Sequence, residues 1–228
     1  MGLTVVEYTP GVYFIDYNGQ RLLATRNLTP GRRVYGEELV DLSGVEYRLW
    51  NPSRSKLGAA IIKGLKRNPI VPGTKILYLG VASGTTCSHV SDIIGESGHV
   101  WGVDFAPRPI RDLVDQVARY RRNITPILGD ARQPQAYALQ VPKVETIFAD
   151  VAQPDQADIV VKNAHIFLRR GGYAMLSIKS RSIDVGRDPS EIYRDQVRIL
   201  ETGGFRIEEV IELDPFEVDH ALALANLV

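Results

Sequence analysis

The feature that most constrains this sequence is residues 76–86, I-L-Y-L-G-V-A-S-G-T-T, in which an apolar run leads into a glycine-rich turn. The turn opens an amphipathic helix candidate at residues 85–95. Small residues at a strand end let the backbone approach a ligand closely, and a helix N-terminus offers unpaired N–H groups with a partial positive charge. An acid, Asp104, ends the next apolar run, 24 residues after Gly80, about where a nucleotide-binding α/β fold places the carboxylate that holds a ribose. The segment therefore predicts a bound cofactor that contains a nucleoside.

Length and composition are those of an ordinary globular protein. The chain has 228 residues, of which 44% are hydrophobic and 24% charged, enough for one large domain or for a domain with a smaller one. A single cysteine, Cys87, excludes an internal disulfide and gives no indication of secretion. Because the sequence has neither an 18-residue apolar run nor a signal-peptide pattern, we expect a cytoplasmic protein with no membrane partner.

Charge is segregated along the chain, although the formal net charge is zero. Residues 47–91 contain no Asp or Glu, and their bases are Arg48, Arg54, Lys56, Lys63, Lys66, Arg67 and Lys75. A second basic cluster consists of Arg108, Arg111, Arg119, Arg121 and Arg122. Residues 201–219 carry seven acids against one base, which makes this segment a candidate protein-docking face. Clustered positive charge suits a polyanion such as RNA, and a solvated helix face with an accidental imbalance explains the same pattern equally well.

Residues 1 to about 50 are predicted to form a small antiparallel sheet. Short segments that alternate or run apolar, V-V-E-Y, V-Y-F-I-D-Y, R-L-L-A-T-R and E-Y-R-L-W, are separated by turn-forming pairs. One of these pairs, Asn18-Gly19, is a strong hairpin signal. A helix candidate follows at residues 53–65, with Ser53 or Ser55 as its N-cap. We therefore expect a small β domain at residues 1–52 and a second domain at 53–228.

From residue 75 onward, strand and helix candidates alternate. The strand candidates are 75–81, 99–104, 124–129, 144–150 and 172–179, and the helix candidates are 85–95, 107–122, 156–169 and 189–202. This alternation predicts a mostly parallel sheet with helices on both faces. The last two strands, F-R-I-E-E-V-I-E-L and H-A-L-A-L-A-N-L, are joined by only D-P-F-E-V-D, which is too short for a parallel crossover. The predicted fold class is therefore α/β: a Rossmann-like methyltransferase fold, with a mostly parallel seven-stranded sheet ending in an antiparallel hairpin.

Polar residues end four of these predicted strands. Since ligands bind outside the carboxyl ends of the strands in an open α/β sheet, Asp104, Asp130, Asp150 and Lys179 should converge on one edge. We expect Asp104 to accept hydrogen bonds from ribose hydroxyls, and Asp130 with the backbone of Ala131 to meet an adenine edge. The glycine loop lacks the lysine of a P-loop and departs from G-x-G-x-x-G. S-adenosyl-L-methionine, which has a ribose but no phosphate, therefore fits this site better than NAD.

A lysine beside an aspartate at a strand end is a candidate for proton transfer. Burial would lower the pKa of Lys179, whereas the carboxylate of Asp150 would orient the amine and favour its charged form. A purely structural ion pair is the more common alternative. Lys56 lies in the first turn of a helix candidate, where a cation opposes the helix dipole, which hints at function. His220 opens the last strand near the same edge, and His89 is expected to be structural. One cysteine and four scattered histidines provide no ligand spacing for a metal.

Several strings in the chain resemble the fibrillarin family, the RNA 2′-O-methyltransferases of box C/D guide ribonucleoproteins. These strings are W-N-P-S-R-S-K-L-G-A-A-I, L-Y-L-G-V-A-S-G-T-T, D-V-A-Q-P-D-Q, L-R-R-G-G, L-S-I-K and F-E-V-D-H. The resemblance extends over nearly the whole chain, and D-V-A-Q-P-D-Q is its most specific string. It is to the archaeal type, because the Gly/Arg-rich N-terminal extension of eukaryotic members is absent.

The resemblance implies a role for individual residues. The family's catalytic Lys-Asp-Lys-His set matches Lys56, Asp150, Lys179 and His220. Its cofactor-binding residues match Gly80, Ala82, Ser83, Gly84, Thr85, Thr86, Asp104, Phe105, Asp130, Ala131, Asp150 and Gln153, with Phe105 packed on the adenine. The residues implied for RNA binding are Arg54, Lys56, Lys179 and Arg181. Asp104 stands where the family usually has Glu, and Cys87 replaces a residue that is commonly aromatic.

The resemblance also implies an activity and an assembly. The activity is transfer of a methyl group from S-adenosyl-L-methionine to the ribose 2′-hydroxyl of nucleotides in rRNA and tRNA. The implied partners are a box C/D guide RNA that selects the nucleotide, a Nop-family scaffold protein and a kink-turn-binding ribosomal-like protein. Two alternatives stay open: a methyltransferase that acts on a protein (glutamine) or a small molecule, and a non-catalytic RNA-binding module. The basic residues 47–91 argue against the first, and the retained catalytic set argues against the second.

Overall fold

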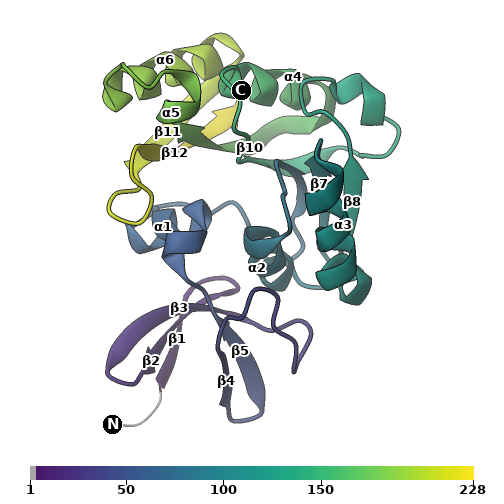
Figure 1. The fold of residues 1–228 in the computed structure, drawn as a ribbon, viewed down its shortest axis with the longest axis vertical. Coiled ribbons are helices and arrows are strands. Elements are labelled where there is room, and N and C mark those ends of the chain that lie inside the picture. The colour runs from purple at the N-terminus through teal and green to yellow at the C-terminus, as the bar shows by residue number, and fades with distance from the viewer. Residues whose placement is uncertain (1–3) are drawn as a thin grey trace.

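The computed structural model describes residues 4–228, which form two β-sheets with helices packed around the second (Figure 1). Residues 1–3 of the predicted N-terminal domain lie outside the described residues. The first sheet is antiparallel, in the order β1-β2-β3-β5-β4. Its strands are β1 (Thr4–Thr9), β2 (Val12–Tyr17), β3 (Gln20–Arg26), β4 (Leu39–Leu42) and β5 (Val45–Leu49). The predicted hairpin at Asn18-Gly19 is confirmed, since both residues have positive φ, 49° and 77°, as the favoured two-residue turn requires.

Sequence reasoning missed strand β4. The strand is only four residues long, L-V-D-L, and the turn to β5 is made by Ser43 and Gly44 with φ of 55° and 80°. A serine adopts left-handed φ only infrequently, so the residue pair did not indicate a hairpin turn. The strand nevertheless pairs with β5 in register from Leu42–Val45 to Leu39–Arg48.

The second sheet has the order β11-β12-β10-β9-β6-β7-β8. Its strands are β6 (Lys75–Leu79), β7 (His99–Asp104), β8 (Ile124–Leu128), β9 (Val144–Ala149), β10 (Leu168–Lys179), β11 (Phe205–Glu212) and β12 (His220–Leu227). All neighbours are parallel except β12, which lies antiparallel to both β10 and β11. The predicted α/β fold with a terminal antiparallel hairpin is therefore confirmed.

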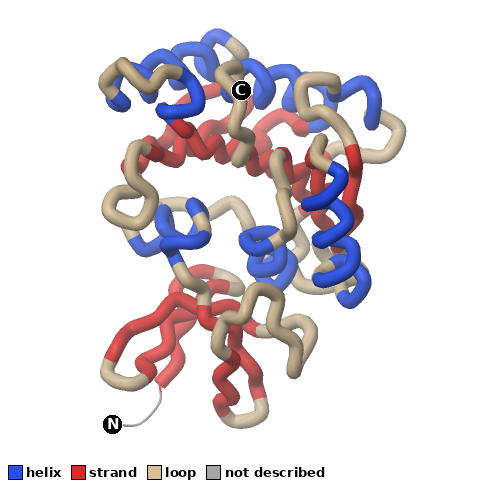
Figure 2. The backbone as a smooth tube through the Cα atoms, in the orientation of Figure 1, coloured by secondary structure: helices blue, strands red, loops and turns tan. Residues whose placement is uncertain are grey.

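Helices cover both faces of this sheet, as Figure 2 shows. They are α1 (Lys56–Ile62), α2 (Thr85–Ile94), α3 (Pro107–Gln116), α4 (Gln156–Phe167), α5 (Ser180–Ile183) and α6 (Pro189–Thr202). Alternate residues of β6 point to opposite faces: Leu77 and Leu79 enter the core beneath α4 and α6, whereas Ile76 and Tyr78 enter the core beneath α1 and α2. Burial on both faces explains why the strand is a continuous apolar run.

Three of the predicted helices are longer than the helices in the structure. The candidate at 107–122 is broken at Val117, whose φ of −123° and ψ of −66° are not helical, and a short 3₁₀ turn (Ala118–Tyr120) follows. The candidate at 156–169 ends at Phe167, because the chain continues directly into β10. The candidate at 53–65 is a 3₁₀ turn (Pro52–Arg54) followed by α1, whose N-cap is Ser55.

A buried ion-pair network joins the first sheet to α2. Arg48 of β5 lies 2.6 Å from Glu37 and 2.8 Å from Asp92 of α2, and Arg121 lies 2.5 Å from the same Asp92. All four side chains are at most 1% exposed. The expectation that clustered bases offer a surface to RNA is therefore wrong for Arg48 and Arg121, which neutralise interior carboxylates.

The two oppositely charged segments also contact each other. Arg67 lies 3.4 Å from Glu208, the backbone N–H of Lys66 donates to Glu209 at 3.0 Å, and Lys56 lies 3.5 Å from Glu217. Some of the bases in the basic segment therefore pair with acids of the same chain. The bases lie on α1 and the loop after it, and the acids lie on the β11–β12 hairpin.

His89 of α2 is structural, as predicted. Its ring stacks on Trp50 with centroids 4.7 Å apart, its Nδ1 lies 2.8 Å from Thr25 Oγ1, and its Nε2 lies 2.6 Å from the hydroxyl of Tyr35. Burial, followed by the charge of Arg48, holds the pKa of His89 well below its usual range. Within residues 4–228, none of the helices is both long and apolar enough to span a bilayer.

Candidate active site

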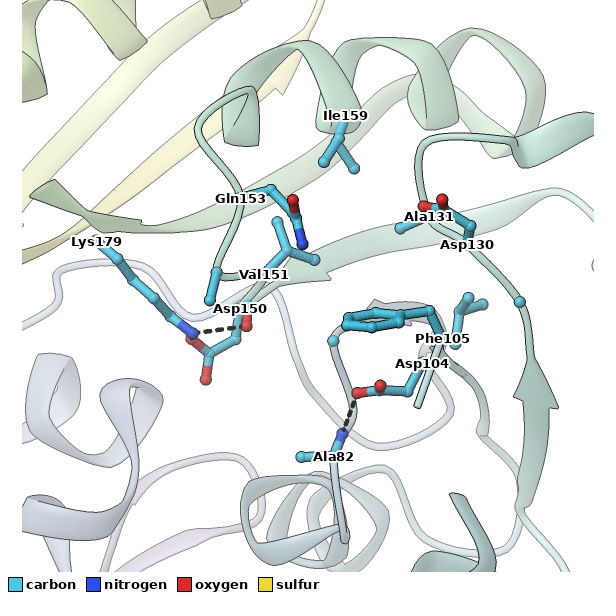
Figure 3. A pocket seen from close by; sticks show the side chains of 14 residues that line it. Ala82, Asp104, Phe105, Asp130, Ala131, Asp150, Val151, Gln153, Ile159 and Lys179 are labelled. Carbon is cyan, nitrogen blue, oxygen red and sulfur yellow. Dashed lines mark hydrogen bonds and ion pairs between the residues drawn. The ribbon is translucent and has the colours of Figure 1, made fainter. Parts of the chain in front are cut away.

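A pocket opens at the carboxyl ends of β6, β7, β8, β9 and β10, the edge where the strand-end residues were predicted to converge (Figure 3). It is lined by Gly80, Ala82, Val103, Asp104, Phe105, Gly129, Asp130, Ala131, Asp150, Val151, Ala152, Gln153, Ile159 and Lys179. Eight of the twelve residues predicted to bind the cofactor are in this lining, together with the catalytic candidate Lys179. The lining therefore combines apolar and polar groups, and it includes Gly80 and Ala82 of the glycine loop.

The glycine loop has a conformation that its sequence explains. Gly80 has a φ of +76°, and a Cβ at this position would lie 2.7 Å from the carbonyl oxygen of Asp150, so only glycine fits. The carboxylate of Asp104 accepts from the backbone N–H of Ala82 at 3.0 Å and from that of Ala106 at 3.0 Å. Asp104 therefore fixes the loop. An ionised carboxylate can accept about four hydrogen bonds, which leaves acceptor capacity on the pocket side for ribose hydroxyls.

The far end of the pocket suits a planar base. Phe105 lines it with 65% of its surface exposed, and Ile159 and Ala131 add apolar surface. Asp130 is held by Arg132, whose guanidinium donates to it at 2.8 Å. This hydrogen bond lowers the pKa of Asp130. The lining thus fits an adenosine group, with the aromatic face of Phe105 for the base and the carboxylates of Asp104 and Asp130 to accept from hydroxyl and amino groups.

The other four predicted cofactor residues, Ser83, Gly84, Thr85 and Thr86, are not in the pocket lining. Gly84 is the N-cap of α2 in a left-handed conformation, and a Cβ there would lie 2.5 Å from Leu113. The hydroxyl of Thr86 donates to Ser55 at 3.0 Å. These two residues hold the start of α2 in place.

Two lysines share one aspartate at the mouth of the pocket. Lys179 Nζ lies 2.8 Å from the carboxylate of Asp150 and donates to the same residue's backbone oxygen at 2.9 Å. Lys56 Nζ lies 3.5 Å from the other carboxylate oxygen of Asp150 and 3.5 Å from Glu217. The four side chains are between 16% and 21% exposed. The structure therefore brings three of the four predicted catalytic residues together: Lys179 from the end of β10, Asp150 directly after β9, and Lys56 at the start of α1.

His220, the fourth, is beside this cluster but is not shown in contact with it. Its backbone is paired with that of Lys179 across β10 and β12, and its Nδ1 lies 2.7 Å from the backbone oxygen of Val218. Of the remaining residues predicted to bind RNA, Arg181 pairs with Asp219 at 2.8 Å. The exposed Arg54 lies over the ring of Tyr35 at 4.9 Å.

Sequence reasoning missed Glu217 and five pocket residues, Val103, Gly129, Val151, Ala152 and Ile159. Glu217 belongs to the string F-E-V-D-H, but its partner Lys56 is 161 positions earlier, and no local pattern links them. Val151 and Ala152 directly follow the strand-end Asp150, so their place after a strand could have indicated them. Residues 4–228 contain no group of three or more His, Cys, Asp or Glu side chains arranged to hold a metal ion.

An open, mostly parallel sheet with an antiparallel hairpin at one edge, and a pocket above its central glycine loop, defines the Rossmann-like class of S-adenosylmethionine-dependent methyltransferases. Within that class the chain belongs to the fibrillarin family, whose model matches residues 4–228.

Individual relatives are similar over nearly their full lengths. The fibrillarin-like rRNA/tRNA 2′-O-methyltransferase of Thermococcus onnurineus is 57% identical over 214 residues, which are 93% of this chain and 94% of the relative. The crystal structure of Aeropyrum pernix fibrillarin with natively bound S-adenosyl-L-methionine has a TM-score of 0.89 and 53% identity, with 98% of this chain and 100% of that chain covered. A fibrillarin/Nop5p complex has a TM-score of 0.87 and 37% identity, with the same coverage.

Proposed function

We propose that this protein transfers a methyl group from S-adenosyl-L-methionine to the ribose 2′-hydroxyl of nucleotides in rRNA and tRNA. The observation that carries the proposal is the Lys56–Asp150–Lys179 cluster beside a pocket whose lining suits adenosine. Membership of the fibrillarin family and the similarity to a fibrillarin that binds S-adenosyl-L-methionine support the same activity.

The cofactor is proposed to lie with its adenine against Phe105, near Asp130 and Ala131, and its ribose at Asp104. Gln153 completes the wall, and the backbone turn at Gly80 lets the ligand approach closely. When bound, S-adenosyl-L-methionine supplies a methyl group already activated for transfer, so positioning provides much of the catalysis. Ser83, Gly84 and Thr85 are proposed to support this binding through the loop and the start of α2, whereas the predicted cofactor residue Thr86 has its hydroxyl turned to Ser55.

Lys179 is proposed to remove the proton of the 2′-hydroxyl at its Nζ. Asp150 orients this amine by a 2.8 Å ion pair and by its backbone oxygen, and the remaining hydrogen-bonding direction of the amine is free for the ribose. An amine must be neutral to accept a proton, so turnover requires the uncharged form of Lys179. Lys56, which is farther from Asp150, is proposed to hold the RNA near the site, with His220 at its edge.

RNA binding is proposed for Arg54, Lys56 and Arg181 through contacts with phosphates, and for Lys179 through the ribose hydroxyl that it deprotonates. Phosphate contacts of this kind position a substrate without reading its sequence. Sequence selection is therefore proposed to come from a box C/D guide RNA. The fibrillarin/Nop5p complex supports a Nop-family scaffold partner. A kink-turn-binding ribosomal-like protein and a cytoplasmic location complete the proposal.

We also propose a domain division between residues 52 and 53. The last strand of the first sheet ends at Leu49, and the 3₁₀ turn that leads into α1 begins at Pro52. The small β domain then presents its buried Arg48 to the methyltransferase domain, which holds the pocket.

The proposed function is tested by methyl transfer from labelled S-adenosyl-L-methionine to a guide-paired RNA, with the partner proteins added. Incorporation that disappears when the target nucleotide is 2′-deoxy supports ribose 2′-O-methylation. Label that enters a partner protein at a glutamine, with none in the RNA, contradicts the proposal and supports the alternative acceptor class.

A further inference from the structure

A buried pair of hydroxyls joins the helix that starts at Lys56 to the helix that follows the glycine loop. Thr86 Oγ1, in the first turn of α2, donates to Ser55 Oγ at 3.0 Å. Ser55 is the N-cap of α1, and its Oγ also accepts from the backbone N–H of Gly58 at 3.2 Å. Ser55 and Thr86 are 2% and 8% exposed. The hydroxyl pair is therefore shielded from water, which would otherwise compete for both groups.

Lys56 depends on its backbone for its position more than Lys179 does. It is the first residue of α1, where a cation opposes the helix dipole, and the first turn contains no acid. Its ammonium is 3.5 Å from each of its two carboxylate partners, whereas Lys179 has a 2.8 Å ion pair and a backbone hydrogen bond. A small shift of the Ser55 cap would therefore move Lys56 out of reach of Asp150.

Apolar packing restricts the same helix from the other side. A Cβ on Gly58 would lie 3.2 Å from the indole of Trp50, and Trp50 in turn stacks on His89 of α2 at 4.7 Å. The start of α1 is thus in close contact with α2 through two neighbouring links. The Trp50 link fixes the distance between the helices, and the hydroxyl pair fixes the direction of the N-cap.

We infer that Ser55 and Thr86 are positioning residues for Lys56, and this inference rests on the proposed function. Thr86 lies two residues after Gly84, the N-cap of α2, so the first turn of α2 connects the glycine loop to Ser55. Through its hydrogen bond to Ser55, the first turn of α2 fixes the backbone position from which the Lys56 side chain extends. The protein therefore keeps its RNA-holding lysine at a fixed position relative to the methyl-donor pocket, and Thr86 acts through Lys56 rather than on the cofactor.

The test replaces Thr86 by Val, which keeps the branched shape but removes the donor, and by Ser, which keeps the hydroxyl. Both variants are assayed in the assembled complex with its guide RNA. For Thr86→Val we expect kcat to fall about 10- to 100-fold, because Lys56 would no longer hold the RNA in place and a misplacement of the reacting ribose by about 1 Å has an effect of this size. The Kd for S-adenosyl-L-methionine should stay within about twofold, and Thr86→Ser should retain most of the activity. The matched control is Thr202→Val, at the exposed end of α6.

A double variant distinguishes action through Lys56 from a general structural effect. In a Lys56→Met background, Thr86→Val should reduce kcat no further, because the group it positions is gone. Losses that multiply in the double variant would overturn the inference. So would a weakened Kd for S-adenosyl-L-methionine at unchanged kcat, which would make Thr86 a cofactor contact.

A second measurement needs no activity, so failure of the proposed function can be recognised separately. The rate at which an amine-reactive acylating reagent modifies Lys56 is followed by mass spectrometry, with Lys63 as the internal reference. Thr86→Val should raise the Lys56 rate several-fold, while Thr86→Ser and Thr202→Val should not. An unchanged Lys56 rate overturns the inference even if methyl transfer is never observed, whereas an inactive wild-type complex with the expected labelling contradicts only the proposed function.

Discussion

Replacement of Arg48 by Met should destabilise the protein far more than the same change at an exposed arginine. Arg48, Arg121, Glu37 and Asp92 form a neutral buried set of two cations and two anions, with side chains at most 1% exposed. Without Arg48, two interior carboxylates face one guanidinium. Breaking a buried pair by removal of one partner costs about 3–5 kcal/mol, because a buried charge is left uncompensated.

The control is Arg67→Met, which removes a pair with Glu208 at 3.4 Å whose arginine side chain is 60% exposed. An exposed pair of this kind contributes less than about 1 kcal/mol. With a urea m-value of about 3 kcal/mol per M for a chain of this size, the Arg48→Met midpoint should fall by roughly 1–1.7 M. The Arg67→Met midpoint should fall by less than about 0.3 M.

The assay is equilibrium unfolding in urea at low salt, followed by the fluorescence of the two tryptophans. Adding Glu37→Gln to Arg48→Met restores charge balance in the network and should recover part of the loss. Equal midpoint shifts for Arg48→Met and Arg67→Met would refute the reasoning. A double variant less stable than Arg48→Met alone would refute it too, because the unpaired buried charge would then not be the cause of the loss.

Three further outcomes are expected. Gly80→Ala should weaken S-adenosyl-L-methionine binding at least about tenfold by calorimetry, because a Cβ there lies 2.7 Å from a backbone oxygen. The control is Gly31→Ala, which has a similar φ of +81° but no atom within 4 Å of the added Cβ. The control variant therefore has the backbone strain of about 1–2 kcal/mol without the clash. Lys179→Ala should lower kcat by about 10²-fold or more, because the proposed proton acceptor is lost; turnover at the wild-type rate in the assembled complex would exclude Lys179 from that role. Burial holds the pKa of His89 below 6.5, so the unfolded chain binds a proton that the folded chain excludes. Stability from His89 is therefore present above about pH 6.5 and is lost as the pH falls below it, by up to about 1.4 kcal/mol per pH unit. Urea titrations between pH 5.5 and 7.5 should show this slope reduced in His89→Gln.

The sequence predicted the site well where one geometric rule sufficed. Parallel strands bring their carboxyl ends to the same edge, so the order of strands and helices along the chain was enough to place Asp104, Asp150 and Lys179 together. The antiparallel pairing of the last two strands was equally accessible, because a six-residue link is too short for a crossover.

The sequence could not show which partner a polar side chain contacts when that partner is far away along the chain. Thr86 follows the glycine loop and matched a cofactor contact, but its hydroxyl donates to Ser55, 31 positions earlier. Arg48 and Arg121 were counted as surface charge because their partner Asp92 is 44 and 29 positions away. Pairings at such separations depend on how helices and strands pack, and residue composition or periodicity contains no record of them.

The place of β12 in the sheet also determines the order in which the protein can be built during synthesis. This strand lies between β10 and β11, yet the ribosome makes it after both. Until β12 emerges, β11 has no neighbour to join, and the unpaired edge of β10 is open to pairing with other chains. The loop that precedes β12 contains Glu217, so Lys56 acquires its second carboxylate only in this last step. A chain that ends at residue 212 would therefore leave one edge of β10 without its partner strand and Lys56 without Glu217.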